Sequence, residues 1–279
     1  MVKISADSTC DLSTEIINRL NISIIPLNVV IGDQVYQDGV NIFPEDIVRY
    51  VDFEGASCRT ASINIHEYQR HFDELSKSGV DIVHVCLGSD FSSCYQNAVL
   101  ASKSFDNVHI IDSRNLSTGS GHLVYEGALM AQNGSPIEEI LNMMKEDIKK
   151  IDASFVIDRL DYLVKGGRCS AFTAQGARLL NIKPSIQVLD SEMHAGKKYR
   201  GSFQRCIKNY VLDRIKDLDN LDTKRIFITH CLCPDEVVEQ ARQLIIDYGN
   251  FEEVHITTTG STITTHCGPK TLGIGLKRL

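Results

Sequence analysis

The sequence predicts an α/β protein of two domains, with a parallel sheet in the first domain and a mixed or antiparallel sheet in the second. Three observations support this fold class. The chain has 279 residues, which is about twice the common size of a single domain. Short apolar runs alternate with helical periodicity through the first half, as in a sheet with crossover helices. After a charged segment at residues 145–152 the pattern changes, so we place the domains at residues 1–152 and 153–279.

Strands and helices alternate in the first domain. A strand at residues 2–5 precedes a helix with Leu12, Ile16 and Leu20 on one face and Asp11 as its capping residue. The helix after residue 136 begins at Ser135-Pro136-Ile137-Glu138, a capping box with proline at the first helical position. The other expected elements are extended segments at residues 22–31, 81–87 and 108–111 and helices at residues 44–51, 66–76 and 92–105.

Strands dominate the second domain. Residues 153–157 and 184–189 read as strands, and the turn Asp190-Ser191 predicts a hairpin with residues 192–194. A strand at residues 225–230, a helix at 235–247 and a strand at 254–258 follow. We expect helices on one face of this sheet. Residues 257–265 are unusually rich in hydroxyl side chains.

Charge and composition exclude several functional classes. The net charge of -7 and the pI near 5.7 argue against binding to the nucleic-acid backbone, which requires a basic face. A transcriptional regulator is also disfavoured, because no helix-turn-helix pattern is found. The hydrophobic fraction of 43% is that of an ordinary folded chain.

The nine cysteines are scattered and odd in number, which is typical of reduced thiols in the cytosol. The close pair Cys231-Leu232-Cys233 has no second pair at the spacing of a structural zinc site, so we expect no metal. The first residues lack the apolar core of a signal peptide, and no apolar run approaches the roughly 18 residues that span a bilayer. We therefore expect a cytoplasmic protein without membrane insertion.

Two clusters of hydroxyl side chains precede predicted helices. Ser92 and Ser93 stand between a strand and a helix, where free backbone amides and the helix dipole attract an anion. Thr60 and Ser62 form a second polar cluster before the next helix upstream. An isolated serine or threonine at such a position is more often only a helix cap or a turn residue.

His266 is the third candidate. It lies with Cys267 between small residues before Gly268-Pro269, in a predicted rigid loop where a histidine can approach another backbone closely. A lone histidine is more often structural than functional. Lys165-Gly166-Gly167-Arg168, placed before a helix, resembles a phosphate cradle but does not match a nucleotide-binding loop, and the hydrolase pattern Gly-x-Ser-x-Gly is absent. The residues alone predict an anion-binding α/β protein.

Several separated motifs, in this order along the chain, resemble the DegV family, the bacterial fatty-acid-binding proteins that include the carrier subunit of fatty acid kinase. The most specific are Leu160-Asp161-Tyr162-Leu163-Val164-Lys165-Gly166-Gly167-Arg168 and Leu180-Asn181-Ile182-Lys183-Pro184. Asp7-Ser8-Thr9-Cys10-Asp11-Leu12 is similar to the opening motif of the family, and Asp112-Ser113 with Gly119-Ser120-Gly121 is similar to its middle motif. The resemblance covers almost the whole chain. It implies a DegV-like fold, with a Rossmann-like first domain and a ligand pocket between or across the two domains.

The resemblance implies that the ligand is one long-chain fatty acid, with its carboxylate held by Thr60, Ser92 and His266. Ser62, Ser93 and Cys267 belong to the same three motifs and are expected to contact the ligand. The chain departs from the family pattern at Ala61, Ile63, Ser93, Cys94 and Lys270. No cofactor and no catalytic residue is implied.

The resemblance further implies an ATP-dependent kinase partner that phosphorylates the bound carboxylate to an acyl phosphate. Arg168, Lys198 and Arg200 are the candidates for contact with this partner or its phosphate, and a solvated surface cluster is an equal alternative. Two other functions stay open: a small-ketone-binding subunit related to dihydroxyacetone kinase, with His266 forming the adduct, and a weak serine hydrolase that uses Ser92 and His266.

Overall fold

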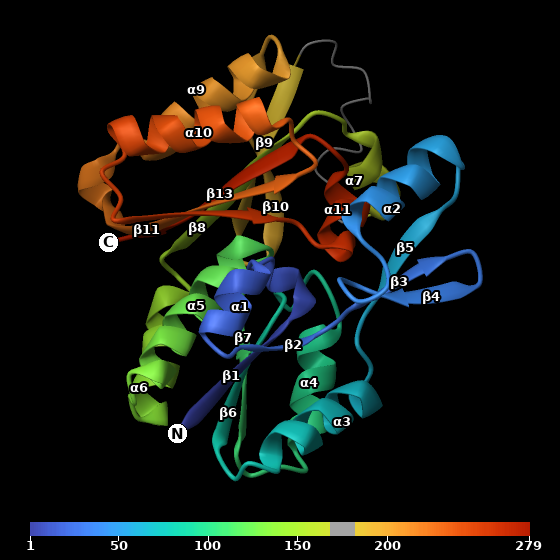
Figure 1. The fold of residues 1–279 in the computed structure, drawn as a ribbon, viewed down its shortest axis with the longest axis vertical. Coiled ribbons are helices and arrows are strands. Elements are labelled where there is room, and N and C mark those ends of the chain that lie inside the picture. Colours follow the sequence, from blue (N-terminus) through green and yellow to red (C-terminus); the bar gives the residue numbers. More distant parts are fainter. Residues whose placement is uncertain (168–181) are drawn as a thin grey trace.

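The computed structural model describes residues 1–167 and 182–279, and these residues form three sheets with helices packed around them (Figure 1). A four-stranded sheet occupies one half of the molecule and a six-stranded sheet the other half. A small three-stranded sheet lies to one side, next to the junction of the two halves (Figure 1). The predicted α/β class, with a parallel sheet followed by a mixed sheet, is confirmed.

The four-stranded sheet is parallel throughout. Its strands are β1 (Val2–Asp7), β2 (Ser23–Ile25), β6 (Asp81–Cys86) and β7 (Val108–Asp112), in the order β2-β1-β6-β7. The central strands β1 and β6 are buried on both faces because helices cover both sides of the sheet. The predicted strands at residues 2–5, 81–87 and 108–111 correspond to β1, β6 and β7.

Two layers of helices cover this sheet. On one face, α3 (Ile65–Ser76) and α4 (Cys94–Ser102) pack against Ile82 and Cys86. On the other face, α1 (Thr14–Arg19), α5 (Thr118–Gln132) and α6 (Ile137–Asp147) pack against Ile4 and Val85. The predicted helices at residues 66–76 and 92–105 correspond to α3 and α4.

Two predicted helix caps are wrong. Ser13, not Asp11, caps α1, and its hydroxyl accepts a hydrogen bond from the Ile16 amide at 3.3 Å. Asp11 instead lies in a left-handed conformation with φ 51° at the end of the short 3-10 helix at Ser8–Cys10. The capping box at Ser135 does not form, because Pro136 itself is the N-cap of α6 and supplies no side-chain acceptor.

The three-stranded sheet was not predicted. It contains β3 (Asn28–Ile31), β4 (Gln34–Gln37) and β5 (Cys58–Ala61), which pair antiparallel in the order β4-β3-β5. The expected single segment at residues 22–31 is divided at Pro26-Leu27 into β2 and β3, which join different sheets. The helix expected at residues 44–51 begins as α2 (Pro44–Val48) and continues as a π-helical turn at Arg49–Phe53.

The six-stranded sheet is mixed. Its strands run in the order β10-β9-β8-β13-β11-β12, and β11 and β12 are the one parallel pair among the described strands of this sheet. Asp190 and Ser191 form the predicted hairpin turn with φ of 48° and 62°. The bounds are Ile151–Ile157 for β8, Ile182–Leu189 for β9, Glu192–Arg200 for β10, Leu221–Cys231 for β11, Glu253–Thr258 for β12 and Thr271–Arg278 for β13.

Helices α9 (Phe203–Ile215) and α10 (Asp235–Tyr248) cover the outer face of this sheet, as expected (Figure 1). Its inner face packs on α5, so that helix contacts strands of both large sheets. Two short helices, α7 (Asp161–Gly166) and α11 (Ser261–Cys267), lie beside the three-stranded sheet (Figure 1). Within the described residues, no helix is both long enough and apolar enough to cross a membrane.

The contact of α5 with the six-stranded sheet generates a pH-dependent prediction. His122 on α5 is 2% exposed and its ring centroid lies 5.0 Å from that of Phe227 on β11. Burial lowers the pKa of His122 to about 3, and the nearby Arg225 acts in the same direction. The unfolded chain binds this proton near pH 6.5, so the free energy of unfolding falls as the pH drops from 6.5 towards 3.

We expect His122→Leu to reduce this decline by up to about 1.4 kcal/mol per pH unit between pH 6.5 and 4. Urea unfolding at several pH values measures the slope, whatever the substitution does to stability at pH 7. His66→Gln, at an exposed position on α3, is the control. Equal slopes for His122→Leu and the wild type would contradict the prediction.

Candidate ligand-binding cavity

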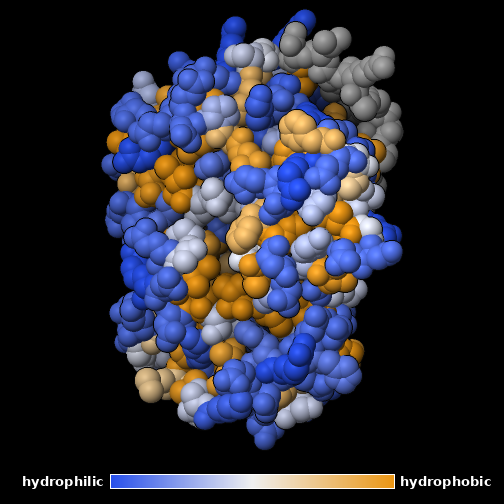
Figure 2. All heavy atoms as spheres, turned by 45° about the vertical axis from the view of Figure 1, so that its right-hand side comes forward, coloured by the Kyte–Doolittle hydropathy of each residue, from blue (hydrophilic) through white to orange (hydrophobic). Residues whose placement is uncertain are grey.

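A cavity of about 750 Å³ lies between the four-stranded and six-stranded sheets. This volume is within the range of roughly 300–1,000 Å³ that is usual for small-molecule sites. The segments that follow the carboxyl ends of β2, β6 and β7 form one side of the cavity. Ligands of parallel α/β sheets commonly bind at this end of the strands. Figure 2 shows hydrophobic residues gathered in a hollow in the middle of one face of the molecule.

All six predicted ligand-binding residues line this cavity: Thr60, Ser62, Ser92, Ser93, His266 and Cys267. They come from β5 and the loop after it, from the loop after β6 and from α11, which are far apart in sequence. The hydroxyl Oγ1 of Thr60 lies 2.9 Å from Nε2 of His266, within hydrogen-bond distance. Thr60, Ser92 and His266 are each partly buried, so a bound group could reach them from the cavity.

His266 is in a helix and not in the predicted loop. It belongs to the last turn of α11, which ends where Gly268 adopts φ 70°. The expected close approach to another backbone is confirmed, because a Cβ atom built on Gly166 would lie 2.3 Å from Nδ1 of His266. Only glycine at position 166 leaves room for the ring in this orientation.

Two buried carboxylates hold the N-terminus of α11. Asp11 accepts a hydrogen bond from the Gly260 amide at 2.8 Å, and Asp38 accepts one from the Ser261 amide at 2.6 Å. Negative groups stabilise a helix N-terminus because the first amides have no partner within the helix. Burial raises the pKa of Asp11 well above its usual value, although the hydrogen bond from Ser117 opposes this shift.

Ser92 both caps a helix and faces the cavity. Its hydroxyl oxygen accepts a hydrogen bond from the Cys94 amide at 3.3 Å and donates to the Cys94 sulfur at 3.2 Å. The first helical residue is Cys94, and Ser93 makes no capping bond with its side chain. Burial raises the pKa of Cys94 to about 12, so this thiol stays neutral.

Cys267 contributes a neutral wall to the cavity. Its thiol and that of Cys231 form a hydrogen-bonded pair, which together with burial raises the pKa of Cys267 well above its usual value. Cys267 is 5% exposed and Cys231 is 1% exposed. We therefore assign Cys267 no nucleophilic role.

Two of the basic residues predicted to contact a partner, Lys198 and Arg200, do not line the cavity. Lys198 and Arg200 occupy exposed positions on β10 and are outside the described cavity lining. Arg168 lies outside the described residues. Lys165 and Gly166 end α7 and Gly167 follows with φ 64°, whereas the helix predicted after this segment lies outside the described residues.

The sequence analysis missed most of the cavity wall. The apolar part is built from both halves of the chain, by Leu27, Leu87, Leu116, Phe155, Leu163, Val188 and Met193. A second part carries hydroxyl groups, from Ser117, Thr118, Thr229, Thr259, Thr262 and Thr271. The hydroxyl-rich run at residues 257–265 was the only signal for the second part. Buried apolar residues give no signal that separates a cavity wall from a core.

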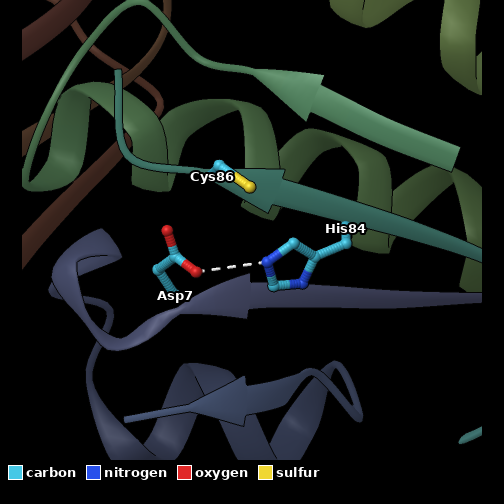
Figure 3. A group of neighbouring side chains, drawn as sticks. All are labelled: Asp7, His84 and Cys86. Atoms are coloured by element: carbon cyan, nitrogen blue, oxygen red, sulfur yellow. Dashed lines mark hydrogen bonds and ion pairs between the residues drawn. The ribbon is translucent and has the colours of Figure 1, made fainter. Parts of the chain in front are cut away.

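A separate cluster of side chains comes from two neighbouring strands of the four-stranded sheet. Asp7 at the end of β1 and His84 and Cys86 on β6 point toward one another (Figure 3). Their potential ligand atoms lie within 4.8 Å of one another. Asp7 accepts hydrogen bonds from Tyr68 at 2.7 Å and from the Leu87 amide at 2.9 Å. The nitrogen Nε2 of His84 contacts Asp7 at 3.1 Å, and Nδ1 contacts the Ser5 hydroxyl at 2.9 Å. Hydrogen bonds therefore account for the polar atoms of Asp7 and His84 without an ion.

Comparison with known proteins agrees with this fold. A fatty acid-binding protein of Thermotoga maritima is 32% identical over 286 residues, covering 100% of this chain and 98% of its own. A DegV domain-containing protein of Clostridium acetobutylicum is 31% identical over 276 residues, covering 98% of this chain and 97% of its own.

A solved structure of a DegV lipid-binding protein from Thermotoga maritima superposes with a TM-score of 0.86 at 27% identity, covering 100% of this chain and 98% of that one. DegV of Bacillus subtilis, described as a fatty acid binding protein, superposes with a TM-score of 0.85 at 25% identity, covering 100% and 99%. The family model described as "Uncharacterised protein, DegV family" matches residues 1–278. The chain therefore belongs to the DegV family.

Proposed function

We propose that this protein binds one long-chain fatty acid in the cavity, with the carboxylate held by Thr60, Ser92 and His266. The observation that carries the proposal is the 2.9 Å contact between Thr60 and His266 on a cavity whose other walls include a continuous set of apolar side chains. An amphipathic ligand matches both features. The relatives and solved structures named as fatty-acid-binding proteins support the same ligand class.

Neutral donors hold the head group in this proposal. In the complex the Ser92 hydroxyl exchanges its bond to the Cys94 sulfur, and Thr60 and His266 exchange their mutual bond, for bonds to the carboxylate oxygens, which offsets the cost of removing the charge from water. Ser62 and Ser93 add hydroxyls to the same part of the cavity. Hydrogen bonds from these groups position the carboxylate in this proposal, and the described cavity lining contains no lysine or arginine.

The acyl chain supplies most of the affinity. Each methylene group that moves from water into the apolar part contributes roughly 0.8 kcal/mol, so a long chain gains on the order of 10 kcal/mol before the cost of ordering it. The division into domains at residue 152 belongs to this proposal, because it places the ligand between two α/β units. Phe155 and Val188 then contact the chain from one unit and Leu27 and Leu116 from the other.

The protein is a carrier and not an enzyme in this proposal. A cytoplasmic kinase partner phosphorylates the bound carboxylate to an acyl phosphate, and this chain contributes no nucleophile. Lys198 and Arg200 are exposed on β10, where a partner could contact them. Arg168 is the third basic residue that we assign to this contact.

The hydroxyl groups of the site generate the first prediction of the proposal. Mild extraction of the purified protein should yield about one fatty acid per chain, and the emptied protein should gain thermal stability when oleate is added. Thr60→Val keeps the shape but removes a hydrogen bond to a charged group, so we expect the affinity to fall roughly 10- to 100-fold. Thr14→Val, exposed on α1, should leave it unchanged. An empty protein that oleate does not stabilise would refute the proposal.

The contact between Gly166 and His266 generates the second prediction. Gly166→Ala places a methyl group where the ring now lies, so the ring must move and its contact with Thr60 is lost. We expect a fall in oleate affinity at least as large as for Thr60→Val, measured by isothermal titration. Lys165→Ala, on the exposed side of the same helix, is the matched control. Unchanged affinity in Gly166→Ala would show that His266 does not hold the carboxylate in this orientation.

The kinase partner generates the third prediction. Oleate-loaded protein, ATP and an extract of its own cells should together form an acyl phosphate, which hydroxylamine traps as a hydroxamate. Lys198→Ala with Arg200→Ala should lower this yield while the oleate affinity stays at the wild-type level. No hydroxamate above the level obtained without the protein would count against a kinase partner, but not against fatty acid binding.

A further inference from the structure

The inner face of strand β13 carries glycine at two successive positions. Leu272 and Ile274 belong to the core beneath α9 and α10, on the outer face of the six-stranded sheet. Residues of a strand alternate between its two faces, so Gly273 and Gly275 lie on the inner face. Glycine within a strand often marks a place where another group approaches the backbone closely.

At Gly275 that group is a helix of the protein itself. A Cβ atom built on Gly275 would lie 3.2 Å from Oγ1 and 3.4 Å from the carbonyl oxygen of Thr118, at the start of α5. Gly275 is buried and outside the described cavity lining. The missing side chain at this position therefore allows α5 to pack directly on the sheet.

Gly273 is open to the cavity instead. A Cβ atom built there would lie 3.0 Å from the Ser154 carbonyl oxygen and 3.1 Å from Cβ of Phe155, and the three nearest heavy atoms all belong to the neighbouring strand β8. Gly273 lines the cavity and is partly exposed, whereas Leu272 and Ile274 beside it are 0% and 1% exposed. Its exposed surface therefore faces the cavity.

Gly273 lies between two levels of this cavity. The first level is that of Thr271, whose hydroxyl donates to the Cys267 carbonyl at 3.0 Å, so it adjoins α11. The second is that of Ala153 and Val188, which are cross-strand neighbours on β8 and β9. The two levels are four residues apart along β13, or about 13 Å, and residues of both line the same cavity.

Two side chains flank the passage between these levels. Phe155 on β8 and Thr229 on β11 are the cross-strand neighbours of Gly273, and both line the cavity. Neighbouring strands lie about 4.8 Å apart, so the backbones of these two residues are separated by about 10 Å. The passage runs between them over the bare backbone of Gly273. A side chain at this position would rise into it.

We propose that Gly273 determines the length of the acyl chain that the cavity accepts. With the carboxylate at His266 on α11, a long chain passes over Gly273 to reach the level of Ala153 and Val188, whereas a short chain ends before it. The inference rests on the proposed fatty-acid site and adds to it a residue that selects the ligand by length.

Displacement of a fluorescent fatty acid from the full-length protein by saturated acids, from octanoic to octadecanoic acid, tests this role. In the wild type each added methylene group should tighten binding up to roughly fourfold until the apolar part is filled. Gly273→Val places a branched side chain in the passage, so the gain should stop at a shorter chain. Hexadecanoic acid should then bind roughly tenfold or more weakly than to the wild type.

Leu272→Val is the matched control, because it changes the same strand on the face that α9 and α10 cover and is outside the described cavity lining. It should keep the wild-type dependence on chain length even if its melting temperature falls. If Gly273→Val does not fold, Gly273→Ala decides, with a smaller effect in the same direction.

An equal loss of affinity at every chain length in the Gly273 variants, or an unchanged affinity for hexadecanoic acid, would overturn the inference and leave fatty acid binding intact. If none of the acids displaces the probe from the wild type, the proposed fatty-acid function itself fails.

Discussion

The position of His266 depends on the hydrogen bonds that Asp11 and Asp38 accept from the first amides of α11. A helix of only seven residues is not stable by itself, so contacts with the rest of the chain must hold it. The hydroxyl of Ser8 donates to Asp38 at 2.9 Å, and that of Ser117 donates to Asp11 at 2.5 Å. Ser8 lies in the segment after β1 and Ser117 in the segment after β7. These two segments thereby fix α11, which follows β12. A Cβ atom at Gly260 would lie 2.8 Å from the Asp38 carboxylate, so the approach also requires a glycine.

The sequence predicted the parts of the fold that have a simple periodicity. Strands β1, β6 and β7 contain short β-branched or apolar runs, and α3 and α10 have one apolar face, so pattern and structure agree. Helix α5 was missed because it is buried on nearly all sides, from Gly119 to Ala128, and therefore has no polar face to reveal a helical repeat. Its three glycines also have low helix propensity, and packing between two sheets overrides that preference.

The candidate site was predicted from the resemblance to the family and not from the periodicity of the sequence. Local chemistry alone identified Ser92 and Thr60 as caps or turn residues, and the structure shows that Ser92 does cap α4 while it faces the cavity. Resemblance to the family selected these two residues together with His266, and the fold brings them to one cavity. The helical position of His266 could not be read from residues 261–267, because threonine-rich segments favour strands and turns.

The neutral head-group site has a consequence for reactivity. An arginine or lysine beside a carboxylate withdraws electron density from its oxygens and makes them poorer nucleophiles. Hydroxyl and imidazole donors orient the same oxygens while they leave the full negative charge on the ligand. If Thr60, Ser92 and His266 hold the carboxylate as proposed, the bound acid keeps its negative charge and its oxygens stay available to attack an electrophile that is brought to the cavity.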